Sequence, residues 1–402
     1  MSQPETAQKS RVSIPWLMLC MNGLLLTSAV WFFIQGRTQL AVSVLGASLL
    51  AGIWHTLLIT SSRTNQKAPL TITRGLRPPH YVQASLQLCL YTYWGLYWDG
   101  VAAFIPLILV QLVFAYAMDS ALAWTRYREW RVGFGPVPIV LSINLFLWFR
   151  EEYFYLQFAL IVLTYLCREY LHWNRNGRST HIFNPSAFSL TAVSAILLLT
   201  GRLDLSRGTE IIESLTLPPN AFELIFLLGL VVQILFRTTL VTLSATVALL
   251  LNFHIASWLA GAPISRLPIE VSVFLGVTLL VTDPSTSPNT AVGKLMFGTI
   301  YGTGTFLAFV GLRWLQLPSF VDKIWMVPVV NLLVPLLDRS AAWISTVVAS
   351  RGGRLTWQPN RFVWLGAYAA VFLLALTSLK NPVVQSQTLF PPPPTSTATP
   401  HM

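Results

Sequence analysis

Long stretches of apolar residues constrain the fold of this chain more than any other feature of its sequence. Residues 185–201, 238–261 and 362–379 contain no Asp, Glu, Lys or Arg. A helix rises about 1.5 Å per residue, so stretches of this length cross, or nearly cross, a hydrocarbon core about 30 Å thick. The bilayer offers the backbone no hydrogen-bond partners, so such stretches are expected to be helical. The sequence therefore predicts a membrane protein built from helices.

The composition excludes a soluble domain. Of the 402 residues, 54% are hydrophobic and 10% are charged, whereas about a quarter of the residues of a soluble protein are charged. In so apolar a chain, a formal net charge of +11 indicates basic cytoplasmic loops rather than nucleic-acid binding. We expect the lipid bilayer, and no nucleic acid, as a partner. The three cysteines show no metal-ligand spacing, so no metal site is predicted.

Hydropathy predicts about thirteen membrane segments, of which two or three are short re-entrant or interfacial pieces. The first, near residues 14–34, is too long for a signal peptide and is followed by another, so no cleavable signal is expected. The segments are expected to begin near residues 13, 39, 79, 101, 135, 154, 184, 221, 238, 269, 294, 323 and 361.

The distribution of Lys and Arg predicts the orientation in the cell (inner) membrane. With the N-terminus in the cytoplasm, eighteen of the 26 basic residues fall on the cytoplasmic side, as the positive-inside rule requires. The eight outside are Arg37, Arg150, Arg202, Arg207, Arg266, Arg313, Lys323 and Lys380. An odd number of crossings puts the C-terminus outside, where the Pro-, Ser- and Thr-rich residues 384–402 are expected to be disordered.

Two apolar segments are interrupted by the same kind of motif, Asn184-Pro-Ser and Asp283-Pro-Ser. Proline lacks an N–H and disfavours helical geometry in the residue before it. Irregular backbone inside a membrane survives only where it is buried in protein or lines a cavity. Paired interruptions therefore predict a repeat with a binding site between its halves. The alternative is that both are ordinary helix starts with Pro in the first turn.

Polar residues in the apolar segments are expected either to join helices or to bind a ligand. Asn144, Asn252 and Asn331 lie deep in their segments, and a single Asn in a membrane more often joins helices than binds a ligand. Acids near helix ends, such as Asp119 and Asp338, are expected to face a partner or water.

Three motifs resemble those of a known family. Arg168-Glu-Tyr with His181-Ile-Phe-Asn-Pro-Ser-Ala-Phe resembles the first signature of the NqrB/RnfD family, the membrane subunits of ion-translocating, flavin-containing NADH:quinone and NADH:ferredoxin oxidoreductases. Val281-Thr-Asp-Pro-Ser-Thr-Ser-Pro resembles the second and Asn331-Leu-Leu-Val-Pro-Leu-Leu-Asp the third, in the family's order. Phe134-Gly-Pro-Val-Pro looks closer to a divergent branch of RnfD-like proteins near enediyne-biosynthesis loci.

The resemblance implies an all-α polytopic membrane fold of two five-helix structural repeats with broken helices, plus flanking helices. The implied divisions are an N-terminal extension with two transmembrane helices (1–78), a core (79–345) with repeats at 79–200 and 221–345, a C-terminal transmembrane helix within 346–383, and the tail 384–402.

One departure from the family concerns its flavin. Family members carry flavin mononucleotide (FMN) on the threonine of Ser-Gly-Ala-Thr between the halves, whereas residues 202–220 contain no such string. We therefore expect no covalent FMN on Thr209 or Thr216. The resemblance instead implies non-covalent FMN or riboflavin, or a quinone, between the halves. The candidate cofactor-binding residues are Asn184, Ser186, Asp283 and Thr286.

These observations favour the membrane subunit of an electron-transfer complex. The sequence has no nicotinamide motif, haem pair or iron–sulfur cysteine set, so other membrane or redox subunits are expected as partners, and no catalytic residue is assigned. Two alternatives stay open. One is a transporter or channel that uses the same repeat fold, and the other is a structural membrane subunit of a larger complex.

Overall fold

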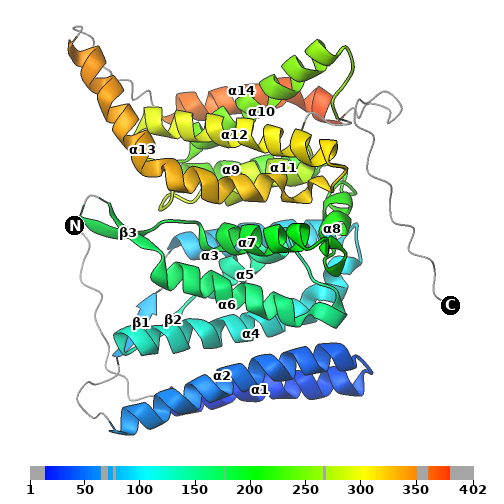
Figure 1. Ribbon diagram of the computed structural model, residues 1–402, viewed down its shortest axis with the longest axis vertical. Coiled ribbons are helices and arrows are strands. Elements are labelled where there is room, and N and C mark those ends of the chain that lie inside the picture. The colour runs from blue at the N-terminus through cyan, green and yellow to red at the C-terminus, as the bar shows by residue number, and fades with distance from the viewer. Residues whose placement is uncertain are drawn as a thin grey trace, which may run out of the picture. The chain divides into compact units, whose positions relative to one another are not determined.

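A computed structural model describes residues 14–64, 71–75, 78–175, 177–265, 269–350 and 361–380. This part of the chain is dominated by fourteen α-helices (Figure 1). They are α1 (Ile14–Ile34), α2 (Thr38–Thr64), α3 (Pro78–Gly95), α4 (Gly100–Tyr127), α5 (Pro136–Asn144), α6 (Tyr155–Tyr170), α7 (Pro185–Leu199), α8 (Gly208–Ser214), α9 (Ala221–Phe236), α10 (Thr239–Ala260), α11 (Val271–Leu275), α12 (Ala291–Trp314), α13 (Asp322–Ser350) and α14 (Arg361–Lys380).

Six helical stretches of the described residues are long and apolar enough to cross a membrane. They are Trp16–Ile34, Thr38–Ser61, Gly100–Tyr127, Thr239–Ala260, Ala291–Trp314 and Ser319–Val348. Large apolar side chains such as Leu199 and Leu374 lie more than 80% exposed on the outside, which suits a lipid-facing surface and not water. The chain is therefore an all-α polytopic membrane protein, as the sequence predicts. The predicted C-terminal tail lies outside the described residues.

Each of the thirteen predicted segments coincides with a helix, but two of these helices are far too short to cross. The nine residues of α5 rise about 14 Å, roughly half the hydrocarbon thickness. The five residues of α11 continue only into the π-helical turn η3 (Gly276–Leu280). That two or three segments are re-entrant or interfacial stays a prediction, and these two helices are the candidates by length.

The described chain separates into two compact units. Unit 1 comprises residues 1–172 and 188–214, and unit 2 comprises residues 173–187 and 215–402. Residues 173–187, which the sequence assigns to the first repeat, thus group with the helices of the second. The division of the core into two repeats stays a prediction.

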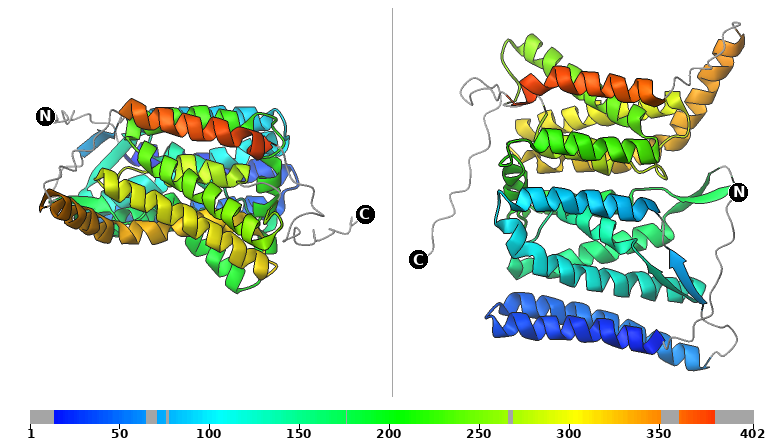
Figure 2. Two further views of the ribbon diagram at one scale, coloured as in Figure 1. Left: turned by 90° about the horizontal axis from the view of Figure 1, so that it is seen from above. Right: turned by 180° about the vertical axis from the view of Figure 1, so that it is seen from behind.

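In unit 1, helices α1 and α2 form a hairpin that packs on α4, with Met18 and Trp124 in a shared apolar cluster. The sequence did not predict the two short strands β1 (Thr71–Gly75) and β2 (Glu129–Gly133), which pair in parallel. Figures 1 and 2 show β1 and β2 at one end of the helices of this unit and α8 at the opposite end.

The order of helices recurs along the chain. The run α3, α4, α5, α6, α7 and the run α9, α10, α11, α12, α13 each have a short third helix. The two Pro motifs do not occupy equivalent places in this order, contrary to the expectation from their likeness. Asn184 precedes the fifth helix of the first run, whereas Asp283 follows the third helix of the second. The equivalent break in the first run is at residues 145–150, after α5.

Three buried side-chain amides lie at the break after α5, and one of them, Gln157, bonds to its backbone. Asn144 and Gln111 exchange two side-chain hydrogen bonds, at 2.8 and 3.2 Å. Gln157 accepts from the Phe149 N–H at 3.2 Å and donates to the Leu147 carbonyl at 3.3 Å. All three amides are fully buried. Asn144 therefore joins segments of the protein, as predicted for a single deep Asn.

In unit 2, α12 packs closely on α10 through two glycines four residues apart. A Cβ atom at Gly298 would overlap the Ser244 hydroxyl and the Val241 carbonyl, and one at Gly302 would overlap the Ala245 carbonyl. Small residues at this spacing let membrane helices approach to van der Waals contact.

We expect Gly298→Ala to lower stability by about 1–3 kcal/mol, because the added methyl group forces α10 and α12 apart. Gly311→Ala is the matched control, since a Cβ there meets nothing within 4 Å, and it should raise stability by about 0.5–1 kcal/mol. Thermal unfolding of the purified protein in detergent measures both. Equal midpoints for the two variants would contradict the close packing.

Candidate functional site

Parts of all three motifs of the family resemblance meet in unit 2, whereas Arg168-Glu-Tyr of the first motif lies in α6 of unit 1. The hairpin of β3 (His172–Arg175) and β4 (Arg178–His181) leads into Asn184, residues 281–290 follow η3, and α13 carries Asn331 and Asp338. Arg175 and Asn184 from the first segment contact the other two. We call this set, Arg175, Asn184, Asn331, Asp338 and residues 281–290, the junction.

Asn184 caps the start of α7. Its Oδ1 accepts a hydrogen bond from the Ala187 N–H at 3.2 Å, which is the N-cap contact that helix starts favour. The interpretation as an ordinary helix start with Pro in the first turn is therefore right for this motif. The same side chain does more, because its Nδ2 donates to the carbonyl of Leu280 at 3.0 Å. That carbonyl ends η3 and lacks a helical partner.

Asn331 holds the two broken segments together. It lies in α13 and is 1% exposed. Its Oδ1 accepts from the Asn184 N–H at 3.0 Å, and its Nδ2 donates to the Thr286 carbonyl at 3.1 Å. A single amide thereby satisfies one backbone group in each segment. Buried polar groups are inexpensive only when paired in this way.

The four predicted cofactor residues play different parts. Asn184 and the backbone of Thr286 meet at Asn331. Asp283 instead shapes its own turn, since its Oδ1 accepts from the N–H and the hydroxyl of Ser285 at 2.9 and 2.7 Å. Ser186 is buried in the first turn of α7. The structure thus brings two of the four onto one side chain.

Arg175 links the β3–β4 hairpin to the rest of the junction by hydrogen bonds. Its Nη2 and Nε donate to Asp338 Oδ2 at 2.6 and 3.1 Å, and its Nη1 donates to the Ser287 carbonyl at 2.8 Å. Asp338 Oδ1 also accepts from the Asn289 N–H at 3.2 Å. The expectation that Asp338 faces a partner is confirmed. Its partner lies 163 residues away in sequence.

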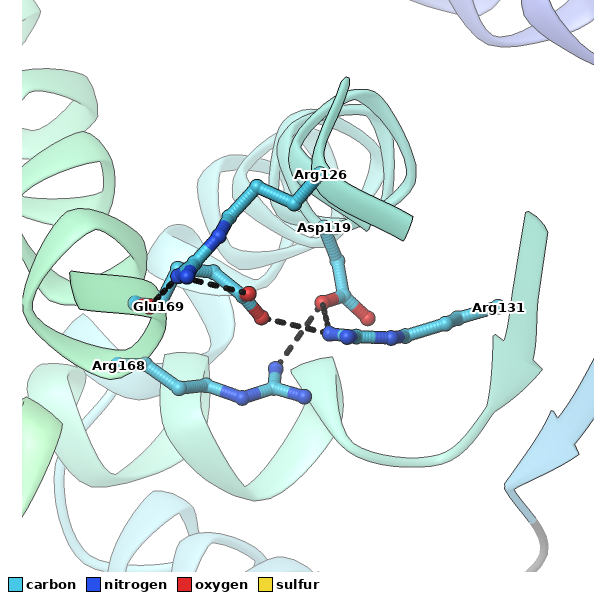
Figure 3. A network of polar contacts seen from close by, with 5 residues as sticks. All are labelled: Asp119, Arg126, Arg131, Arg168 and Glu169. Carbon is cyan, nitrogen blue, oxygen red and sulfur yellow. Dashed lines mark hydrogen bonds and ion pairs between the residues drawn. The ribbon is translucent and has the colours of Figure 1, made fainter. Parts of the chain in front are cut away.

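A second polar cluster lies in unit 1, where α4, β2 and α6 meet (Figure 3). Asp119 accepts from Arg168 Nη1 at 3.1 Å, and Glu169 Oε1 accepts from Arg131 Nη1 at 2.6 Å. Arg126 donates to the Glu169 carbonyl. Both acids are buried, so Asp119 has the partner that the sequence predicts for it.

The cluster retains one excess positive charge, because three arginines meet two carboxylates. Burial lowers the pKa of the adjacent His172, although Glu169 acts in the opposite direction. A neutral His172 at pH 7 adds nothing to that charge. The arginine side chains are 20–33% exposed, so the cluster lies at the edge of the protein interior and ties three elements together there.

The segment where the family carries its flavin is ordered. Residues 202–220 contain the short turn Leu203–Leu205 and helix α8, rather than a plain linker. Thr209 and Thr216 are both exposed, whereas Ser206 is buried. The expectation that neither threonine carries covalent FMN stays a prediction.

Comparison of the chain with protein-family models, with curated proteins and with solved structures found no match. The resemblance to the NqrB/RnfD family therefore depends on the three motifs.

We expect Asn331→Ala to destabilise the protein by roughly 2 kcal/mol or more, because it leaves the Asn184 N–H and the Thr286 carbonyl unpaired. Asn252→Ala is the matched control. Asn252 is a membrane asparagine that bonds within its own helix at 2.6 Å and to the Thr303 hydroxyl at 3.2 Å. Thermal unfolding in detergent should show the larger loss for Asn331→Ala. An equal or smaller loss would mean that the junction does not depend on this amide.

Proposed function

We propose that this chain is the membrane subunit of an electron-transfer complex similar to those of the NqrB/RnfD family. The observation that carries the proposal is the convergence of the three motifs. Short strings that match a family by chance have no reason to lie together in space. Here the residues near positions 184, 286 and 331 are joined by direct hydrogen bonds through Asn331. A shared structural role of these strings supports a shared ancestry.

The recurring helix order gives independent support. Two runs of five helices, each with a short third helix, agree with the repeat that the family resemblance implies. The multi-pass membrane character agrees with it as well. In this proposal partner subunits supply and accept electrons, because the chain has no motif for nicotinamide, haem or iron–sulfur clusters.

The junction does not fit the phosphate of FMN. Phosphate sites use cations and backbone N–H groups that point at the ligand. Here the Arg175 guanidinium is bonded to Asp338 and to the Ser287 carbonyl, and the Asn184 and Asn289 N–H groups are bonded to side chains. Riboflavin or a quinone, which has no phosphate, is the more compatible cofactor for this chain.

A transporter or channel is the second candidate. The observation that favours it is the pair of short helices, each followed by irregular backbone. Membrane transporters use such discontinuous helices to present polar backbone to a substrate. A structural subunit is the third, and the complete internal bonding of Asn184 agrees with it.

We place the protein in the cell (inner) membrane with its N-terminus in the cytoplasm. Single cysteines at Ser61 and Thr209 test this orientation, because both side chains are exposed and belong to the C-terminal end of α2 and to α8, which lie at opposite ends of unit 1 (Figure 1). In a background without Cys20, Cys89 and Cys167, a membrane-impermeant maleimide should label Thr209→Cys on intact cells. It should label Ser61→Cys only after permeabilisation. Identical labelling of both would contradict the orientation.

The electron-transfer proposal is tested by what the purified chain carries. We expect its intact mass to match the sequence alone, because residues 202–220 lack the attachment motif. We expect solvent extraction to release riboflavin or quinone in an amount comparable to the protein, and release of FMN would contradict the phosphate argument while supporting electron transfer. A protein of the same mass that releases none of these would favour the transporter and structural alternatives. An FMN adduct on Thr209 or Thr216 would contradict the motif argument while supporting electron transfer.

A further inference from the structure

A small cavity inside unit 2 is lined by two carboxylates. Glu270 precedes α11, and Asp322 begins α13. The hydroxyl-bearing Thr305 of α12 lines the same cavity, whose remaining wall includes the rings of Phe253 and Phe309. The cavity has a volume of about 10 Å³, which is room for about one water-sized particle.

Each carboxylate of this cavity has one buried oxygen that lacks a hydrogen-bond partner among the described residues. Asp322 is 0% exposed. Its Oδ1 accepts from the Lys323 N–H at 2.7 Å, whereas its Oδ2 is buried and, among the described residues, has no partner. Glu270 Oε2 is buried and unpartnered in the same sense. Buried oxygens left in this state cost free energy unless something occupies the space between them.

The charges around the cavity favour a cation as the occupant. Lys323, which is 1% exposed, lies 3.4 Å from Asp322 Oδ1 and also donates to Ser272 Oγ at 2.9 Å. This ammonium offsets one of the two carboxylate charges. One further positive charge would neutralise the other.

We propose that the cavity binds one monovalent cation, a proton or Na⁺, between Glu270 and Asp322. A divalent ion is excluded by two features. Ca²⁺ and Mg²⁺ take six or more oxygen ligands and Zn²⁺ favours Cys and His ligands, whereas this wall offers Glu270, Asp322, Thr305 and one serine among apolar side chains. A second positive charge would also face the Lys323 ammonium. A bound proton forms an O–H bond on one carboxyl group, and no other bond changes.

A larger pocket borders the small cavity, and the cation would exchange through it. It has a volume of about 470 Å³, lies between α10 and α14, and shares Phe253 and Ser265 with the wall of the small cavity. The proposed site does not depend on the electron-transfer proposal, because it rests on side chains that the family motifs do not include.

Other titratable and charged groups near the cavity must be controlled for. The Tyr301 hydroxyl donates to the Lys323 carbonyl at 3.0 Å. The Arg313 guanidinium lies over the Phe309 ring at 5.4 Å from its centroid. His254 lines the larger pocket, so a response that comes from its imidazole must be separated from one that comes from a carboxyl group. His254→Gln is therefore the control variant.

The test uses the full-length protein in detergent, first in choline buffer without Na⁺. Infrared difference spectra report a protonated carboxyl group by its C=O band, and thermal unfolding reports stability from pH 5 to 9. A site that holds a proton in the native state only should show the band at neutral pH. Its folding constant should fall as pH rises, by about tenfold per pH unit where one proton is released on unfolding. Asp322→Asn and Glu270→Gln should each abolish the band and that pH dependence, and His254→Gln should keep both.

A Na⁺ site gives a different result. Added NaCl, but not choline chloride, should raise the unfolding temperature of the wild type with saturation and remove any carboxylic-acid band. Both acid variants should lose this response. A wild type without the band and without a specific Na⁺ response would overturn the proposal and leave a bound water as the occupant. Responses that persist unchanged in Glu270→Gln, which leaves the Asp322–Lys323 contact in place, would overturn it as well.

Discussion

The structure depends on the need to pair every backbone N–H and C=O group where the bilayer supplies no water. Long helices meet this need by themselves, but α5 and α11 stop after nine and five residues. The chain that follows each of them requires partners from elsewhere. In unit 1 the partner is Gln157, which Asn144 contacts in turn, and in unit 2 the partners are Asn184 and Asn331. Side-chain amides suit this task because each offers donors and an acceptor without a charge.

Charged side chains have a different distribution from the amides. In unit 1 the arginines that pair with Asp119 and Glu169 remain 20–33% exposed, so their guanidinium groups keep part of their hydration while the acids are buried. In unit 2 the Arg175–Asp338 pair is also part-exposed, at 12% and 25%. Breaking a pair that is desolvated on one side costs more than a surface pair contributes. These pairs therefore keep part of their hydration, whereas the Asp322–Lys323 pair of unit 2 is buried at both partners.

Sequence predicts the helices well because hydropathy is a local property. Each expected segment matches a helix, and the acids Asp119 and Asp338 have the partners that their cost in a membrane requires. Sequence does not identify those partners, since Arg175 lies 163 residues from Asp338 and spacing says nothing about which cation meets which acid. The pairing of β1 with β2 was missed for the same reason. Asn331 was recognised as deep, but its partners are backbone groups, which look alike in every sequence.

The two Pro motifs have similar sequences but occupy different positions in the order of helices. Asn and Asp before Pro-Ser recur because both residues can cap the backbone that follows them, and that chemistry is the same wherever a helix begins or a turn closes. Asn184 begins a helix, whereas Asp283 closes a turn after η3. The likeness of these strings therefore does not locate equivalent positions of the predicted repeat.

The requirement that buried polar groups be paired explains the residues of the junction, but it does not explain Glu270 and Asp322. At the junction, Asn184, Asn331 and Arg175 bond fully to the protein's own chain, so their residue types are explained by structure. Asp322 differs only in part, because the buried ammonium of Lys323 lies 3.4 Å from its Oδ1 and accounts for one carboxylate. The same cavity holds a second carboxylate, Glu270, for which that single ammonium provides no charge. The excess negative charge therefore points to an occupant that carries the opposite sign.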